Sequence, residues 1–73
     1  GTVKTVLQAE AYTYLEVINA ANEEIWLAGP RLDIQPGEQV EYSTGVKMSG
    51  FYSKELQRAF KEILFVGQVL RLQ

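Results

Sequence analysis

The sequence contains no cysteine and no histidine. Without thiols no disulfide can cross-link the fold, and without thiolates or imidazoles the usual zinc ligand sets are excluded. The sequence also lacks a nucleophile elbow, a phosphate-binding loop and a dinucleotide-binding fingerprint, so the common catalytic constellations are missing. Its acidic residues do not follow the spacing of a calcium loop. We therefore expect a protein that is not an enzyme and that needs neither a metal nor another cofactor.

The sequence is also poor in net charge and in long hydrophobic runs. Seven basic and nine acidic residues give a net charge of −2, which offers no basic footprint for a nucleic-acid backbone. Hydrophobic runs such as Ile63–Val66 fall far short of the about 20 residues that a membrane-spanning helix needs. We predict no integral membrane segment. No signal peptide is visible, and because the chain starts at Gly1 rather than Met, we expect a fragment of a longer precursor.

The length of 73 residues predicts one domain, residues 1–73. A chain of this size and without cross-links must be stabilised by apolar burial, and 47% hydrophobic residues make that feasible. Period-2 alternation with frequent turn signals predicts a mainly β protein. The expected strands are Thr2–Gln8, Tyr12–Ile18, Glu24–Ala28, Gln39–Ser43 and a fifth strand from Ala59.

The connections carry their own signals. Asn19–Asn22 is suited to a hairpin because Asn tolerates left-handed backbone angles, and Pro36-Gly37 is typical of a type II turn. Ser53–Gln57 is expected to form one or two helical turns before the last strand, because Ser53 is a favourable N-cap residue. Five short strands in so small a chain favour an all-β, five-stranded OB-like barrel, with an SH3-like barrel as the competing architecture.

The alternation of the second and third strands predicts their register. Leu15 and Leu27 are expected to face each other in the core, because a shift by one residue would expose the apolar residues of the third strand. That register places Trp26 opposite Glu16 and diagonal to Tyr14. The second and third strands should then carry an outward cluster of Tyr12, Tyr14 and Trp26.

Two interpretations of these aromatic residues remain open at this stage. The outer face of an OB-fold is where oligonucleotides and oligosaccharides bind, so the rings could form a stacking platform. Alternatively, the rings pack under the segment Lys47–Tyr52 and complete a small core. The carboxylates of Glu16 and Glu24, which project near this face, would repel a phosphate chain.

The segment Lys47–Tyr52 is expected to be a loop that closes one end of the barrel. Met48 and Phe51 are suited to plugging that end, and Gly50 permits a close turn. The competing interpretation is a pocket for an anionic or aromatic ligand. Its candidate residues are Phe51, Tyr52, Lys54 and Arg58.

The strings "GTV", "YTYLEV", "EIWLAGP", "IQPGEQV" and "KMSGFYSKELQRAFKEILFV" occur in this order between Gly1 and about Val66. This arrangement resembles the NrfJ-related small exported proteins of bacteria. The most specific part of the resemblance is the combination of Met48, Phe51, Ser53, Lys54, Leu56, Arg58 and Phe60. The chain departs from the family pattern at the hairpin Asn19–Asn22, which lacks a glycine, and at Ala59, where threonine is usual.

The resemblance implies an OB-like barrel in an exported protein, either periplasmic or anchored as a lipoprotein. It also implies an association with nitrite-reductase or related redox machinery, as a binding or accessory module for an unidentified protein or small ligand. Homologues in this family are loosely described as DNA-binding or nucleotide-binding, which matches the alternative of single-stranded nucleic-acid or oligosaccharide binding. The wider exported OB-like group includes a chaperone that attaches haem through a histidine, and this chain has none.

Overall fold

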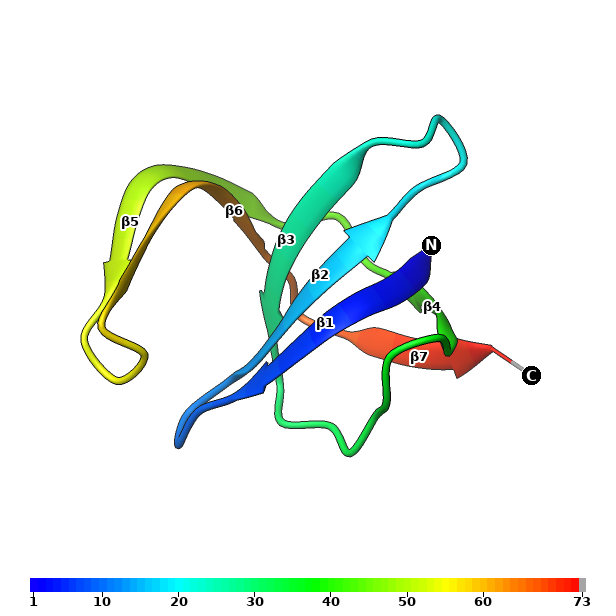
Figure 1. The fold of residues 1–73 in the computed structure, drawn as a ribbon, viewed down its shortest axis with the longest axis horizontal. Coiled ribbons are helices and arrows are strands. Elements are labelled where there is room, and N and C mark those ends of the chain that lie inside the picture. The colour runs from blue at the N-terminus through cyan, green and yellow to red at the C-terminus, as the bar shows by residue number, and fades with distance from the viewer. Residues whose placement is uncertain (73) are drawn as a thin grey trace.

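The computed structural model describes residues 1–72, and every regular element in that range is a strand. The all-β class predicted from the sequence is therefore confirmed. Figure 1 shows the strands in chain order. They are β1 (Thr2–Gln8), β2 (Thr13–Ile18), β3 (Glu24–Gly29), β4 (Gln39–Tyr42), β5 (Val46–Ser53), β6 (Arg58–Phe65) and β7 (Val69–Leu72).

The seven strands form one sheet in the order β5-β6-β3-β2-β1-β4-β7. β1, β2 and β3 make an antiparallel meander, β6 runs parallel to β3, and β4 pairs with β1 at a single position. The sheet is not closed into a barrel, so the predicted five-stranded OB-like barrel is not confirmed. The number of strands differs from the prediction in the last part of the chain.

Two strands are added to the five expected: β5 occupies the segment Lys47–Tyr52 that was expected to be a loop, and the strand expected from Ala59 is divided into β6 and β7. The pairing of β4 with β7 and the pairing of β5 with β6 follow the same antiparallel register. This ladder is interrupted between the pairs Tyr42↔Val69 and Val46↔Phe65. Gly45 lies in this gap, and a Cβ placed on it would overlap the carbonyl oxygen of Phe65. The paired segments β4–β5 and β6–β7 therefore bend where Gly45 packs against the backbone of Phe65.

The predictions for residues 47–57 were wrong in detail. Lys47–Tyr52 is not a loop but most of β5, and Met48 is 42% exposed rather than a plug. The segment after Ser53 is a hairpin turn, not a helix, with Gln57 at a φ of 50°. Ser53 still acts as a local cap, because its hydroxyl oxygen accepts a hydrogen bond from the Leu56 N–H (3.3 Å). Cross-strand pairing along β5 and β6 outweighs the local helical preference of this segment.

The register predicted for the meander is confirmed. Leu15 pairs with Leu27 and Glu16 with Trp26. The connection has an odd number of residues, and its Asn22 adopts a φ of 63° as expected for an asparagine in a tight loop. The side-chain oxygen of Asn19 accepts hydrogen bonds from two N–H groups of the loop, which holds the loop closed.

The first apolar cluster lies on one face of the meander. The segment between β3 and β4 covers this face together with β4 and β7. The type II turn predicted at Pro36-Gly37 is present: Gly37 has a φ of 95°, and the N–H of Glu38 bonds to the carbonyl of Gln35 (3.3 Å). The buried members of this first core are Val3, Leu15, Val17, Leu27, Ile34, Val40 and Val66.

One buried polar side chain ties this covering segment to the sheet. Thr13 is 2% exposed, and its hydroxyl donates to the side-chain oxygen of Gln8 (2.7 Å) and accepts from the Leu32 N–H (2.9 Å). The hydroxyl thus satisfies a backbone donor that would otherwise have no partner.

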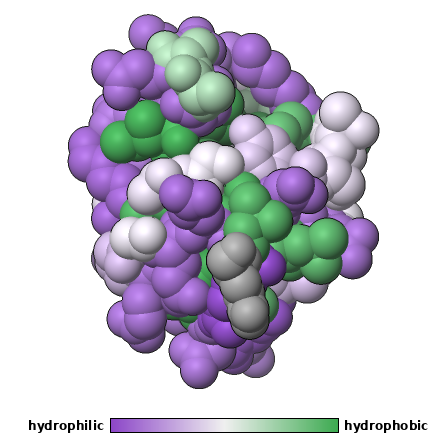
Figure 2. Space-filling model, turned by 90° about the vertical axis from the view of Figure 1, so that its right-hand side faces the viewer, coloured by the Kyte–Doolittle hydropathy of each residue, from purple (hydrophilic) through white to green (hydrophobic). Residues whose placement is uncertain are grey.

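The N-terminus and β7 lie on one side of the molecule (Figure 1). Figure 2 shows this side: hydrophilic side chains cover most of it, and hydrophobic side chains appear in separate patches between them. β7 contributes two exposed leucines, Leu70 and Leu72. Their exposure follows from the position of β7 at the end of the sheet, where only β4 neighbours it.

Candidate functional site

The opposite face of the meander carries a second, aromatic core. Tyr14, Trp26 and Ala28 point to this face, and Phe60 of β6 lies against them. The Phe60 ring is stacked on Tyr14 at 5.6 Å with an interplanar angle of 3°, and it meets Trp26 edge-on at 5.1 Å. Phe60 is therefore the centre of a cluster that joins the β5–β6 hairpin to the meander.

The hairpin reaches this face because it curves. Figure 1 shows β5 and β6 arching away from β3 toward the hairpin turn. Phe60 and Ile63 are both buried although they are three residues apart, so β6 departs from strict alternation between them. Gly50 on the facing strand has a φ of 66°, which a residue with a side chain adopts only at a cost. This irregularity lets the hairpin bend over the second face.

Arg58 completes the outer side of the aromatic core. Its guanidinium carbon lies 4.5 Å from the centre of the Trp26 ring and 5.0 Å from that of Phe60. Both contacts are within the range of cation–π attraction. The arginine stem covers apolar surface while the charged group remains in solvent.

The structure brings five of the seven predicted site residues together and leaves two apart. The rings predicted to face outward are on the expected face, but Tyr14 is only 3% exposed there, whereas Tyr12 remains 40% exposed. Tyr14 and Trp26 pack against Phe60 as the packing interpretation expects, and Tyr12 keeps an exposed ring at the edge of the cluster. Tyr52 is on β5 and Lys54 in the hairpin turn, and both are exposed. The five residues that gather around the aromatic core are Tyr12, Tyr14, Trp26, Phe51 and Arg58.

Sequence reasoning missed the two phenylalanines that organise this core. The sequence pattern predicts only that Phe60 and Phe65 belong to the strand expected from Ala59, and neither is among the candidate site residues. Phe65 meets Tyr12 at 5.6 Å and Phe51 at 5.0 Å, both edge-on. The signal that could have revealed this core is the presence of aromatic residues in two segments that pair as one hairpin, β5 and β6. This signal can be used only when β5 is recognised as a strand.

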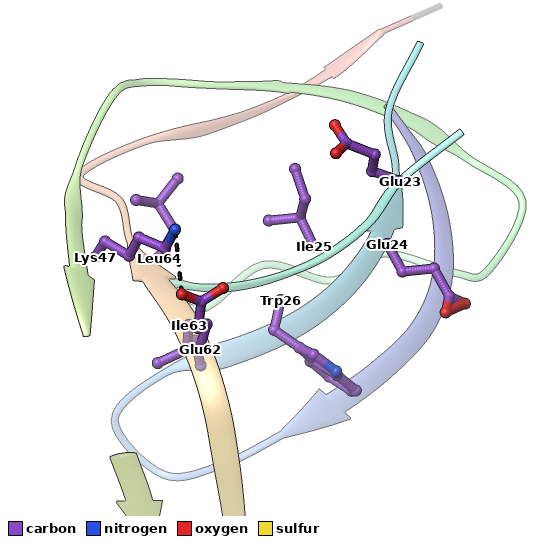
Figure 3. A pocket seen from close by; sticks show the side chains of 8 residues that line it. All are labelled: Glu23, Glu24, Ile25, Trp26, Lys47, Glu62, Ile63 and Leu64. Atoms are coloured by element: carbon purple, nitrogen blue, oxygen red, sulfur yellow. Dashed lines mark ion pairs between the residues drawn. The ribbon is translucent and has the colours of Figure 1, made fainter. Parts of the chain in front are cut away.

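A groove opens beside this core, where β3 and β6 separate. The two strands pair only at Leu27↔Leu64 and Ala28↔Phe65, although both strands continue beyond these positions. The space between them has a volume of about 390 Å³. Of the predicted site residues, only Trp26 lines it. The lining residues are Glu23, Glu24, Ile25, Trp26, Lys47, Glu62, Ile63 and Leu64, as drawn in Figure 3.

The groove has an apolar interior and a charged rim. Figure 3 shows Ile25 and Trp26 pointing to opposite sides of β3, so apolar surface lies on both sides of that strand. Lys47 and Glu62 form an ion pair of 3.3 Å at one side of the groove. Three carboxylates and one ammonium group line the groove in total. The rim is therefore predominantly negative.

The Glu24 carboxylate is also paired. Lys4 of β1 approaches it to 2.5 Å. The hydrogen bond to Glu24, together with the negative charges of Glu24 and Glu16, raises the pKa of Lys4. Lys4 therefore remains charged wherever the protein is folded near neutral pH, and it partly compensates the negative rim.

Within residues 1–72, no three aspartate, glutamate, histidine or cysteine side chains lie close enough together to hold a metal ion. The same part of the chain contains no helix that is long and apolar enough to cross a membrane.

No protein-family model matches the chain, and no match was found among curated proteins or among solved structures.

Proposed function

We propose that this chain is a non-enzymatic binding module that receives its ligand in the groove between β3 and β6. The observation that carries the proposal is the early separation of these two strands, which leaves an apolar interior open to solvent beside the aromatic core. A volume of about 390 Å³ lies in the range of small-ligand sites, which is about 300–1,000 Å³. Trp26 supplies the largest apolar side chain in the groove and Glu62 part of its polar rim.

The same proposal includes an OB-like arrangement of the strands. If each bend is disregarded, β4 and β5 form one long strand, and β6 and β7 form another. The sheet then has five strands in total. β1 contacts the first of these long strands, and β3 runs parallel to the second. This neighbour relationship is what supports an OB-like origin of the sheet.

The biological setting proposed for this module is an exported one. The resemblance to the NrfJ-related proteins supports a periplasmic or lipoprotein-anchored location and an accessory role beside nitrite-reductase or related redox machinery. In that setting the ligand would be a segment of a protein or a small molecule of the same compartment.

The alternative function is binding of single-stranded nucleic acid or of an oligosaccharide. Tyr12 and Tyr52 favour it, because they are 40% and 55% exposed and could stack on a base or a sugar ring. The exposed Lys54 and Arg58 could contact a phosphate. The carboxylates of the groove oppose a phosphate chain at the groove itself, so the two functions predict different surfaces.

An NMR titration distinguishes these functions. The labelled protein is titrated with single-stranded DNA, with neutral oligosaccharides and with short peptides, and the shifts of the Trp26 and Ile63 amides report the groove. The proposed function predicts that at least one of these probes shifts both amides. Shifts confined to Tyr52 and Lys54, together with an affinity that falls steeply with salt, would support the nucleic-acid alternative. If no probe shifts the groove, the groove proposal is wrong.

A further inference from the structure

We infer that the occupant of the groove is an extended, basic peptide segment of a partner protein, which adds to β3 as an additional strand. This inference rests on the proposed function and specifies its ligand. An exposed strand edge is a known mode of peptide recognition, in which backbone hydrogen bonds supply affinity and side-chain contacts supply specificity.

The first observation is the open edge of β3. The ladder between β3 and β6 begins at Leu27, so Glu24, Ile25 and Trp26 have β2 on one side and no paired strand on the other. The groove lies at this unpaired part of the strand, and all three residues line it. A segment entering the groove therefore meets strand backbone as well as side chains.

The second observation is the direction of the backbone groups along β3. The Asn19 N–H bonds to the carbonyl of Glu23 (3.0 Å), and along antiparallel strands such hydrogen-bonded pairs recur at every second residue. Residues 25, 27 and 29 therefore direct their backbone groups toward β2. In agreement, the carbonyl of Ala28 points to the other side, where it accepts from the Val66 N–H (2.9 Å). Trp26 and Glu24 share the direction of Ala28, so the N–H of Trp26 and the backbone groups of Glu24 face the groove.

The third observation is the chemistry of the walls. An added strand presents its side chains alternately to the two faces of the sheet. Ile25 and Trp26 offer apolar surface on opposite sides of β3, which suits apolar side chains of the added strand (Figure 3). Glu62 is paired with Lys47 and Glu24 with Lys4, so Glu23 supplies the excess negative charge of the rim, which attracts lysine or arginine side chains and repels acidic segments. Charge complementarity therefore favours a basic segment over an acidic segment or a phosphate chain.

The test uses a short peptide of alternating valine and lysine, with an alternating valine–glutamate peptide as its control. A third peptide carries the valine–lysine sequence with alternate backbone nitrogens methylated, which removes the hydrogen-bond donors but keeps the side chains. We expect the first peptide to shift the Trp26 amide and slow its hydrogen exchange. The methylated and the acidic peptides should each bind at least tenfold more weakly.

Two variants of the groove and one outside it complete the experiment. Glu62→Gln and Glu23→Gln should each weaken binding of the basic peptide by up to about fivefold, as expected for exposed ion pairs. Glu41→Gln removes a carboxylate of β4 that lies outside the groove, and it should leave the affinity unchanged.

The outcomes separate the inference from the function. If a sugar or another small ligand shifts the groove while the basic peptide does not, or if backbone methylation has no effect on peptide binding, strand addition is wrong and the binding function stands. If the groove amides shift with protein concentration in the absence of peptide, a second copy of the chain is the occupant and the inference is overturned. If no probe reaches the groove, both fail together.

Discussion

Replacing Phe60 tests whether the β5–β6 hairpin is seated on the meander as described. Phe60 is 3% exposed and contacts three other rings, those of Tyr14, Trp26 and Phe51. Truncating a buried phenylalanine to alanine costs about 3–5 kcal/mol. A chain of 73 residues is expected to have a free energy of unfolding of about 4–11 kcal/mol. Phe60→Ala should therefore remove about a quarter or more of the stability, and at the lower end of the stability range it should unfold the protein.

The assay is equilibrium unfolding in urea, followed by far-UV circular dichroism and by the fluorescence of Trp26, the single tryptophan of the chain. Phe60→Leu is the matched control, because it keeps most of the apolar volume and loses the ring contacts. We expect this variant to cost about 1–2 kcal/mol, which combines an altered shape with lost aromatic contacts. A loss below about 1 kcal/mol for Phe60→Ala would refute the reasoning, since no close-packed core site tolerates that truncation so well.

Three further substitutions test other parts of the fold. Gly45→Ala should destabilise by about 1–3 kcal/mol because its Cβ would overlap a carbonyl of β6. Gly67→Ala is its control: the nearest atom lies 3.9 Å from the new Cβ, and the change should stay within about 0.5 kcal/mol in urea unfolding. Thr13→Val should cost about 1–3 kcal/mol by leaving the Leu32 N–H without its partner, whereas Thr13→Ser should cost less. Because the pKa of Lys4 is raised in the folded state, its ion pair stabilises the fold at neutral pH. This stabilisation should disappear as the pH rises past about 10.4, and Lys4→Met should abolish that alkaline dependence of the unfolding free energy.

The meander could be predicted from the sequence because its signals are local. Alternating residues indicate which faces of β2 and β3 are apolar, and the cost of exposing the apolar residues of β3 selects the pairing of Leu15 with Leu27. The turn at Pro36-Gly37 and the left-handed Asn22 follow from the backbone preferences of single residues. These features needed no information from distant parts of the chain.

The last part of the chain could not be predicted in the same way, because distant contacts decide its structure. The segment with Met48 and Gly50 has the composition of a loop, and its pairing with β6 overrides that preference. The bend at Gly45 depends on the close approach of Phe65, which no local pattern reveals. The candidate site shared this limitation: the face carrying Trp26 was correctly identified, but the hairpin that covers it was not.

Amide hydrogen exchange at Trp26 in the ligand-free protein tests the open edge of β3 most directly. The N–H of Leu27 is directed toward β2 and should be protected, whereas the N–H of Trp26 faces the groove and should exchange much faster. Equal protection of the two amides, together with nuclear Overhauser contacts between the backbones of Ile25 and Glu62, would show that β3 and β6 remain paired there and that no strand edge is available to a ligand.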